Sequence, residues 1–540
     1  MKFIRAFAFL VWFGALAGQP YPDSTLLPLV IINTGGRSIP DDPKIDAAMR
    51  VIDHGPGEMN RPSDLTAAFD GRIAIEIGGA YSSTFPQKPY EIETRDGSGG
   101  NLNVSLLGMP AENDWTLTSN YNDKSFLRNS LAFDLFRLMG HYAPRAKLCE
   151  VIVNAKYQGV YLFSEKIKRD RNRVDIAKLE WNDNSADSLT GGYIIKVDYH
   201  DASNSWRSNF TPIGHPDFPI YFVYYYPKAD TITRQQKSYI RNFFKVMETA
   251  LYGDDFRDPV SGYRRYMDVS TFIDYFIISE VSRNVDGYKK SRYLYKDRDS
   301  RDGLLHSGPP WDFDWAWKNI GECIFGARDG SGWSYQTNEC NPDNKDPAWY
   351  YRLLQDAYFT ERLIGRYFEL RSDVLDTARI WNYMDSVRTC VADAQKRHFA
   401  LWPIDRDYKA PEVDPPVKSY DEELAKLKKW IRLRIRWLDR NMPALRREIV
   451  PVVPVNPVDS TRQAAGGFYP NPASDRLSFQ FDLPVSRITI FDVLGRRIRS
   501  AGYPDAGSGQ IDINGLPAGV FIIRVVQTNG RSFVRKHLIL

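Results

Sequence analysis

The sequence has few of the residues that build metal centres and redox motifs. Its 540 residues include four cysteines and seven histidines, without a CxxC spacing or a Cys/His cluster, which argues against a zinc site. It also lacks a GxxxxGK[ST] loop, a GxGxxG turn after a strand, a GxSxG elbow and an HExxH helix. Beyond the N-terminus there is no run of about 18 apolar residues, so we expect no transmembrane segment.

An excess of charge of one sign is lacking as well. The 71 basic and 67 acidic residues leave a net charge of +4 on the whole chain. So small a charge creates no general field that would attract nucleic acid, and we expect no nucleic-acid partner. Aromatic residues, by contrast, make up 14% of the chain, which favours large cores and flat binding surfaces without choosing a ligand.

The N-terminus has the features of an export signal. Lys2 and Arg5 precede an apolar run, Ala6 to Leu16, which ends in the small-residue pattern Ala15-Leu16-Ala17. A basic start, a short apolar stretch and an Ala-x-Ala end are typical of a secretory signal peptide, here residues 1–17. A buried N-terminal helix is the alternative interpretation.

The four cysteines fit an exported chain, in which disulfides persist. Cys323 and Cys340 flank the Gly/Asp/Asn-rich stretch from Gly326 to Asn338 and are the pair that we expect to be bonded. Cys149 and Cys390 could form a second bridge or remain as two buried thiols.

The C-terminal part of the sequence is distinct in composition. Residues 448–465 are proline-rich and then polar, which predicts an extended linker. Residues 466–540 contain short alternating segments separated by turn residues such as Gly495 and Gly515, the pattern of a small all-β sandwich. The expected strands are Leu477–Phe481, Ile488–Phe491, Gln510–Ile513, Val520–Val526 and Phe533–Leu540.

Three ordered motifs of this region resemble the C-terminal sorting domain of the type IX secretion system: Tyr469–Ala473, Phe491–Arg496 and Leu516–Phe521. The resemblance implies a Bacteroidota-like source, passage through the periplasm and outer membrane to the cell surface or medium, and the type IX secretion machinery as a partner. A sorting signal is an address that a receptor reads, so it says nothing about activity.

Residues 25–447 predict an α+β domain. Cys149–Val153 and Val160–Glu165 alternate around a turn and predict a hairpin, and Tyr193–Val197 predicts a further strand. Helices are expected at Ser125–Met139, at Val269–Arg283 and from Ser419, where Glu422 completes a capping-box pattern. Strands that come first and helices that follow suggest one mixed core with a helical second lobe.

The densest group of chemically useful residues lies between 284 and 314. Asp286 follows a helix, and Asp312 and Asp314 follow a strand; in an extended segment these last two would share one face. Paired carboxylates among aromatic residues are costly to bury without a cation, and oxygen ligands suit Mg²⁺ or Mn²⁺. Phosphoryl transfer needs such ions and an acidic residue that orients the acceptor hydroxyl. The alternative interpretation is that these aspartates have a structural role, in which they cap helices or accept hydrogen bonds from backbone amides.

A series of motifs between about residues 28 and 445 resembles the CotH family of atypical, spore-coat-type protein kinases. The family is identified by the order of seven segments: Gly71–Gly79, Phe85–Tyr90, Asn113–Trp115, Asp123–Asn129, Gly159–Lys166, the Asp286 motif and Trp311–Asp314. The resemblance implies a protein-kinase-like fold with reduced lobes, ATP with Mg²⁺ or Mn²⁺ as cofactors, and transfer of the γ-phosphate to Ser or Thr of secreted or surface proteins.

The same resemblance implies the roles of individual residues. Asp286 corresponds to the catalytic-loop aspartate, and Asp312 and Asp314 contain the metal-binding aspartate. Lys88 is the candidate contact of the ATP phosphates, and Glu165 would pair with it or with another cation. Ser291 stands where the family often has a metal-binding Asn, and Ile77-Gly78-Gly79-Ala80 lacks an Arg that commonly precedes this glycine motif.

Three other interpretations remain open. The departures at Ser291 and before Gly78, together with the scarcity of ATP outside the inner membrane, would fit a catalytically degenerate surface-binding or adhesion protein. Paired carboxylates and aromatics would also fit a glycan-processing enzyme, although the order of motifs speaks against it. Asp297–Gly303 resembles the start of an EF-hand but lacks its closing Glu, and we expect a solvated turn there.

Overall fold

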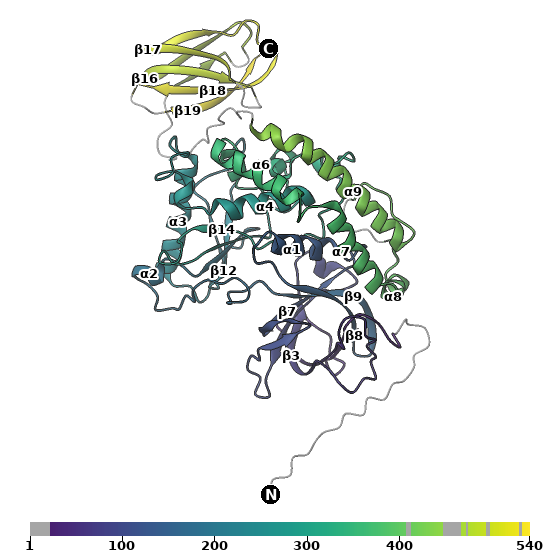
Figure 1. The fold of residues 1–540 in the computed structure, drawn as a ribbon. Helices are drawn as coiled ribbons and strands as arrows, with labels where there is room; N and C mark the ends of the chain where they lie inside the picture. The colour runs from purple at the N-terminus through teal and green to yellow at the C-terminus, as the bar shows by residue number, and fades with distance from the viewer. Residues whose placement is uncertain are drawn as a thin grey trace.

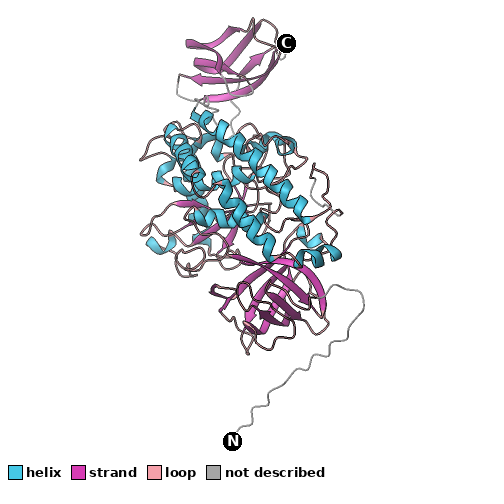
Figure 2. Ribbon diagram, turned by 45° about the vertical axis from the view of Figure 1, so that its right-hand side comes forward, coloured by secondary structure: helices cyan, strands magenta, loops and turns pink. Residues whose placement is uncertain are grey.

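The structure is a computed structural model that describes residues 22–406, 412–446, 466–470, 473–492, 497–528 and 532–539. The predicted signal peptide, residues 1–17, and the predicted linker, residues 448–465, lie outside these described residues. Figures 1 and 2 show a barrel of strands from the N-terminal part of the chain, a helix-rich region next to it, and a separate group of strands from the C-terminal part.

Seven strands form the closed barrel, in the order β1-β2-β3-β4-β7-β9-β8. The sheet closes where β1 pairs in parallel with β8, which leaves no exposed edge. Apolar side chains of alternating positions fill the interior, among them Met49, Trp115 and Phe163, each fully buried. The bounds are β1 (Leu29–Asn33), β2 (Ile45–Ile52), β3 (Phe69–Ile77), β4 (Tyr90–Arg95), β7 (Asp114–Ser119), β8 (Ala146–Val153) and β9 (Lys156–Glu165), with the hairpin β5 (Val104–Leu106) and β6 (Met109–Glu112) beside them.

The predicted hairpin around residue 155 is confirmed. β8 and β9 pair antiparallel through a two-residue turn in which Asn154 and Ala155 both adopt left-handed conformations, with φ of 50° and 61°. Gly159 also has a positive φ, 101°, and a Cβ there would lie 2.8 Å from His398 Nδ1. The glycine therefore lets the helical region approach this hairpin closely.

A second, five-stranded sheet has the order β11-β12-β10-β13-β14. Helix α3 packs on it through contacts such as that between Phe222 and Phe244, whose ring centroids are 4.6 Å apart. The predicted strand at Tyr193–Val197 is β10 of this sheet. The remaining bounds are β11 (Ser205–Arg207), β12 (Tyr221–Tyr226), β13 (Arg292–Lys296), β14 (Leu305–Ser307) and α3 (Arg234–Tyr252).

Helix α4 (Val269–Ser282) lies at the centre of the helical region, and nearly all of its side chains are buried. Figure 1 shows α1, α6 and α9 around it, and a single large core joins them to the second sheet. The other helices are α1 (Arg128–Leu138), α2 (Ala186–Leu189), α5 (Trp349–Leu353), α6 (Ala357–Arg371), α7 (Thr377–Cys390), α8 (Ala394–Leu401) and α9 (Tyr420–Asn441). Short 3₁₀ turns are η1 (Ser82–Thr84), η2 (Tyr263–Arg265), η3 (Cys323–Gly326), η4 (Ser334–Cys340) and η5 (Met442–Arg446).

The predicted helices are present with small shifts of their ends. Helix α1 starts at Arg128 rather than Ser125, because Asp123 accepts hydrogen bonds from the backbone of Ser125 and Arg128 and Phe126 takes a left-handed φ of 62°. Helix α4 stops at Ser282, since Arg283 adopts a left-handed conformation that ends it. Among the described residues no helix is both long and apolar enough to cross a bilayer.

The expected disulfide between Cys323 and Cys340 is confirmed. Of the two interpretations for the other cysteines, the structure supports free thiols: Cys149 is buried in the barrel, whereas Cys390 is exposed at the end of α7 rather than buried.

The C-terminal region is rich in strands, as expected. Its strands are β15 (Gly466–Tyr469), β16 (Arg476–Phe491), β17 (Arg497–Asp512), β18 (Gly519–Gln527) and β19 (Ser532–Ile539). Hydrogen bonds connect all five strands, because the long strand β16 pairs with β15, β17 and β18, and β18 pairs with β19. A core of its own, including Phe479, Ile490 and Val525, holds it together.

Candidate functional site

The turn after α4 holds Asp286. The guanidinium of Arg283 donates to the carbonyls of residues 325, 327 and 331 and anchors the chain as it leaves the helix. The side-chain oxygen of Asn284 then accepts from the Asp286 amide at 3.1 Å, and Tyr275 donates its hydroxyl to the Gly287 carbonyl at 2.7 Å. These bonds fix the turn and leave the Asp286 carboxylate 14% exposed.

Asp312 and Asp314 lie on a loop, so the prediction that they share one face of an extended strand is wrong. Asp312 has a left-handed φ of 59°, which breaks the alternation of an extended chain. The loop is held from two sides: Phe313 donates its amide to Asn129 Oδ1 of α1 at 2.7 Å, and Trp317 donates its amide to the Ser282 carbonyl of α4 at 2.8 Å.

Side-chain contacts connect these segments into one site. Ser291 donates its hydroxyl to Asp312 Oδ2 at 2.5 Å, and Asn284 Nδ2 reaches the Asp312 carbonyl at 3.4 Å. Asn122 donates from Nδ2 to Asp314 Oδ2 at 3.3 Å. The structure thus brings Ser291 and Asp312 into direct contact and places the Asp286 turn beside them.

The carboxylates repel one another. Burial raises the pKa of Asp312 to about 7, the charge of Asp314 adds to the rise, and the hydrogen bond from Ser291 opposes it. Burial also raises the pKa of Asp314, while the charge of Lys318 and the bond from Asn122 oppose that rise. The charge of Asp286 contributes in the same direction at both. Asp312 is nevertheless open to solvent on one side, and a ligand could reach it.

Cations lie on both sides of this acidic group. Lys290 Nζ is 3.3 Å and Lys289 Nζ 3.4 Å from Asp286 Oδ1. Lys290 Nζ also contacts the Tyr199 hydroxyl at 3.1 Å. On the other side Lys318 is buried, and burial lowers its pKa. The site therefore offers positive groups for a phosphate next to carboxylates for a metal.

The two residues expected to contact nucleotide, Lys88 and Glu165, bond to other residues and make no hydrogen bond or ion pair with Asp286, Asp312 or Asp314 in the described structure. Lys88 donates to the Ser83 carbonyl at 2.7 Å, on the barrel side. Glu165 is fully buried at the end of β9, and its carboxylate pairs with Arg145 at 2.8 Å. Of the two pairings that the sequence left open for Glu165, the structure shows the one with another cation.

The residues fit a hard divalent cation in charge and in donor type. Asp312 and Asp314 supply carboxylates, Ser291 a hydroxyl, and Asn122 an amide oxygen that is buried without a hydrogen-bond partner among the described residues. A cation beside these carboxylates would favour their charged forms and oppose the rise in pKa that burial and neighbouring acidic groups cause at both. In the described part of the chain no three His, Cys, Asp or Glu side chains lie close enough to share one ion, so the protein ligands would be two carboxylates and neutral oxygens.

Several residues of the site were not singled out from the sequence. Asn122 directly precedes the Asp123–Asn129 motif, and Lys289 and Lys290 lie between Asp286 and Ser291, so their position in the chain was an available signal. Lys318 gave no such signal, since only the packing of its loop against α1 brings it beside Asp314.

Comparison with known proteins gives two family matches and a distant relative. The family model for the CotH kinase protein matches residues 75–438, which contain every candidate site residue described above. The model for a secretion system C-terminal sorting domain matches residues 467–540. A relative is the inner spore coat protein H of Bacillus subtilis (strain 168), 24% identical over 273 residues, which are 48% of this chain and 68% of the relative.

The sorting domain indicates export through the type IX secretion machinery to the cell surface or outer membrane. The match to the first model covers well over half of the chain. This protein therefore belongs to the CotH kinase protein family and carries a type IX C-terminal sorting domain.

Proposed function

We propose that this chain is an exported protein kinase that transfers the γ-phosphate of ATP to a Ser or Thr hydroxyl of a secreted or surface protein. In this reaction the acceptor oxygen forms a bond to the γ-phosphorus, the bond from that phosphorus to the β–γ bridging oxygen breaks, and ADP leaves. The acceptor proton passes to the carboxylate of Asp286.

The observation that carries this proposal is that carboxylates from two loops lie near enough to influence one another: the charge of Asp286 acts on both Asp312 and Asp314. Asp286 comes from the turn after α4, Asp312 and Asp314 come from the loop that α1 and α4 hold, and Ser291 bonds directly to Asp312. Mg²⁺ or Mn²⁺ held by Asp312, Asp314 and Ser291 would neutralise charge on the phosphates.

The surrounding residues would position the phosphates and the acceptor. Lys289 and Lys290 stand within 3.4 Å of Asp286 Oδ1 and could exchange that contact for phosphate oxygens. Lys88 would have to release the Ser83 carbonyl to do the same. Glu165, committed to Arg145, would act by fixing the end of β9 where it enters the helical region.

The test is transfer of labelled γ-phosphate by the secreted full chain in the presence of Mn²⁺ or Mg²⁺. Asp286→Asn should lower the rate by roughly 10²- to 10⁴-fold, the contribution of a positioned general base. Asp312→Asn should abolish metal-dependent ATP binding measured by calorimetry. Asp255→Asn, at an exposed carboxylate on the turn after α3, is the matched control and should behave as the native protein.

Two results would contradict the proposal: transfer that survives Asp286→Asn, or a native protein that neither transfers phosphate nor binds ATP with either metal. The second result would favour a binding or adhesion protein that has kept the fold without the chemistry.

A further inference from the structure

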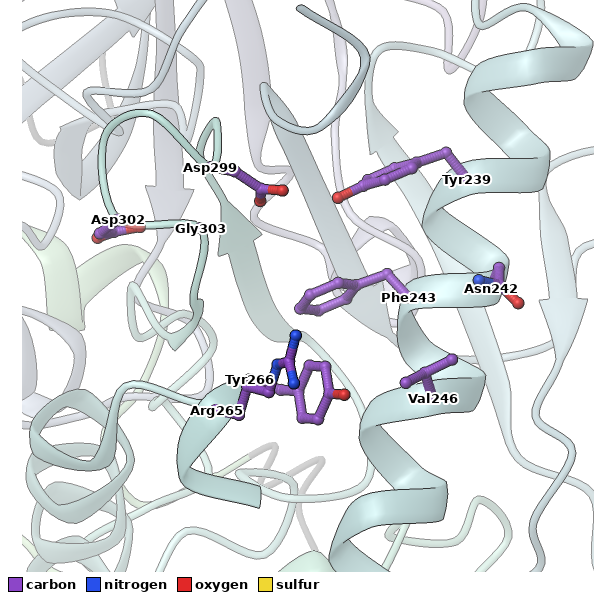
Figure 3. A pocket seen from close by; sticks show the side chains of 9 residues that line it. All are labelled: Tyr239, Asn242, Phe243, Val246, Arg265, Tyr266, Asp299, Asp302 and Gly303. Atoms are coloured by element: carbon purple, nitrogen blue, oxygen red, sulfur yellow. The ribbon is translucent and has the colours of Figure 1, made fainter. Parts of the chain in front are cut away.

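A groove of about 370 Å³ lies between one face of α3 and the turn that joins β13 to β14. Figure 3 shows Tyr239, Asn242, Phe243 and Val246 on successive turns of α3, with Tyr239 and Phe243 pointing toward the turn that carries Asp299 and Asp302. Their spacing places them on one side of the helix, next to the stripe of α3 that packs on the sheet. The volume is in the range of small-ligand sites.

The aromatic walls of the groove are held in place from behind. Tyr239 stacks on the buried Tyr193 with ring centroids 5.9 Å apart. Phe243 and Tyr266 meet edge to face at 6.1 Å. The ammonium group of the buried Lys296 lies 4.9 Å from the Phe243 centroid. Rings fixed in this way form a binding surface that need not be ordered by the ligand.

Four polar groups of the groove make no hydrogen bond to any other residue that the structure describes. They are the hydroxyls of Tyr239 and Tyr266, the amide of Asn242 and the guanidinium of Arg265. Across from them, the carboxylates are partly engaged: Asp299 accepts from Lys296 at 2.8 Å, and Asp302 accepts from His306 at 2.8 Å. Each carboxylate keeps lone pairs for a further donor.

The turn from Asp297 to Gly303 resembles the start of an EF-hand in sequence, but its acidic side chains are bonded to other parts of the protein. Asp297 accepts from Ala177, Arg298 and Arg301, so its oxygens are engaged by the protein. Asp299 is bonded to Lys296 and Asp302 to the imidazole of His306, so each acidic residue of the turn already has a side-chain partner. The lining as a whole is close to neutral.

A strongly charged ligand does not fit this lining. Lys296 already lies against Phe243, and Arg265 lies 5.8 Å from the Tyr266 centroid, so a second cation on these rings would meet a like charge. An anion would face Asp299 and Asp302. The remaining choice is a neutral ligand with an apolar face for the rings and groups at its edge that both donate and accept hydrogen bonds.

A pyranose ring has this character, because its C–H groups form an apolar face and its hydroxyls donate and accept. We infer that the groove binds a neutral glycan, with sugar rings against Tyr239, Phe243 and Tyr266 and hydroxyls between Arg265 and the two carboxylates. The groove lies at the far end of β13 from Ser291, about 16 Å along the strand. It is separate from the proposed kinase site, and its function does not depend on that site.

The test is binding of neutral di- and trisaccharides of glucose, galactose, mannose and N-acetylglucosamine to the secreted full chain, by saturation-transfer NMR and then calorimetry. At least one sugar should bind saturably. Tyr266→Ala should weaken its affinity roughly fivefold to tenfold by removing one ring contact. Asn242→Ala and Arg265→Ala change exposed side chains that make no hydrogen bond to any described residue, so both variants should fold normally and also weaken binding.

Tyr358→Ala is the control for loss of a surface tyrosine, because Tyr358 is 40% exposed on α6 and does not line the groove; it should bind as the native protein does. The inference would be overturned if none of these sugars binds, or if binding persists unchanged in all three groove variants. It would equally be overturned if the groove variants lost affinity for an unglycosylated peptide and not for sugars.

Discussion

At the scale of single residues, Asp312 joins conformation, charge and the proposed chemistry. Its left-handed backbone turns the carboxylate toward Ser291 rather than along a strand. Burial and the neighbouring Asp314 then raise its pKa to about 7. Ionising Asp312 lowers the stability of the folded protein, whereas a bound cation would stabilise the ionised form. A strongly perturbed pKa of this kind is typical of residues at functional sites.

The raised pKa of Asp312 determines whether the stability of the folded protein rises or falls with pH. Below the pKa of the unfolded chain, about 4, Asp312 is protonated in both states and costs nothing. Between about pH 4 and about pH 7 the unfolded chain ionises this residue while the folded protein keeps it protonated, so the folded protein loses stability across that range and the loss is complete above about pH 7. Asp312→Asn stays neutral, so in metal-free buffer it should melt a few degrees above the native protein at pH 8, roughly 2 °C, and the gain should vanish near pH 4.

Thermal melting at the two pH values checks this, with Asp255→Asn as the variant that should show no such trend. A gain in melting temperature that is equal at both pH values would contradict the electrostatic explanation.

At the scale of elements, α9 shows how a local signal sets the end of a helix. Ser419 accepts the Glu422 amide at 3.2 Å, as the sequence pattern predicts. The returning bond differs from a capping box, because the Glu422 carboxylate accepts from the Lys418 amide at 2.8 Å instead of from Ser419. The acidic first turn of α9, which includes Asp421, Glu422 and Glu423, adds favourable charge at the N-terminus.

Removing the cap should lower stability by an amount typical of exposed helix ends. Ser419→Ala should cost about 0.5–2 kcal/mol, and Glu422→Ala should cost less because the Ser419 contact remains. Ser386→Ala, on the exposed face of α7, should change stability by only a few tenths of a kcal/mol. Calorimetric melting of the full chain gives the three values; equal effects of Ser419→Ala and Ser386→Ala would contradict the role of the cap.

At the scale of the whole molecule, the C-terminal strands form a unit with their own core. The buried apolar cluster of this region draws its members from residues 473–539 and includes none of the described residues from 22–446. The family models divide the sequence at the same place, between 438 and 467. Sorting and the proposed chemistry are therefore separable properties of one chain.

Deletion of residues 467–540 should remove sorting and leave the rest of the chain folded. The shortened protein should accumulate inside the cell envelope instead of reaching the surface, because the sorting domain is the part read by the secretion machinery. Its main calorimetric transition should keep the midpoint of the full chain, since the cores do not depend on each other. Surface labelling and fractionation check the first outcome. A shortened protein that still reaches the surface, or that melts well below the full chain, would contradict this division.

Many features of the structure could be predicted from short stretches of the sequence. The hairpin turn at Asn154-Ala155, the helix ended at Arg283, the cap at Ser419 and the disulfide of Cys323 with Cys340 all depend on neighbouring residues or on a short loop. The family and the sorting domain could also be recognised, because their motifs are contiguous. The kinase activity, the roles of Lys88 and Ser291 and the export signal at residues 1–17 stay predictions.

Long-range packing decided the rest. Periodicity predicted strands in the first part of the chain, but which edges meet, and so the parallel closure of β1 on β8, depends on residues about 120 positions apart. The alternation rule failed at Asp312 and Asp314, because contacts from α1 and α4 hold that loop in a conformation which an isolated segment would not choose. Local sequence determines which elements can form; only the tertiary structure determines which charges those elements bring together, because the energy of that contact exists only once the chain is folded.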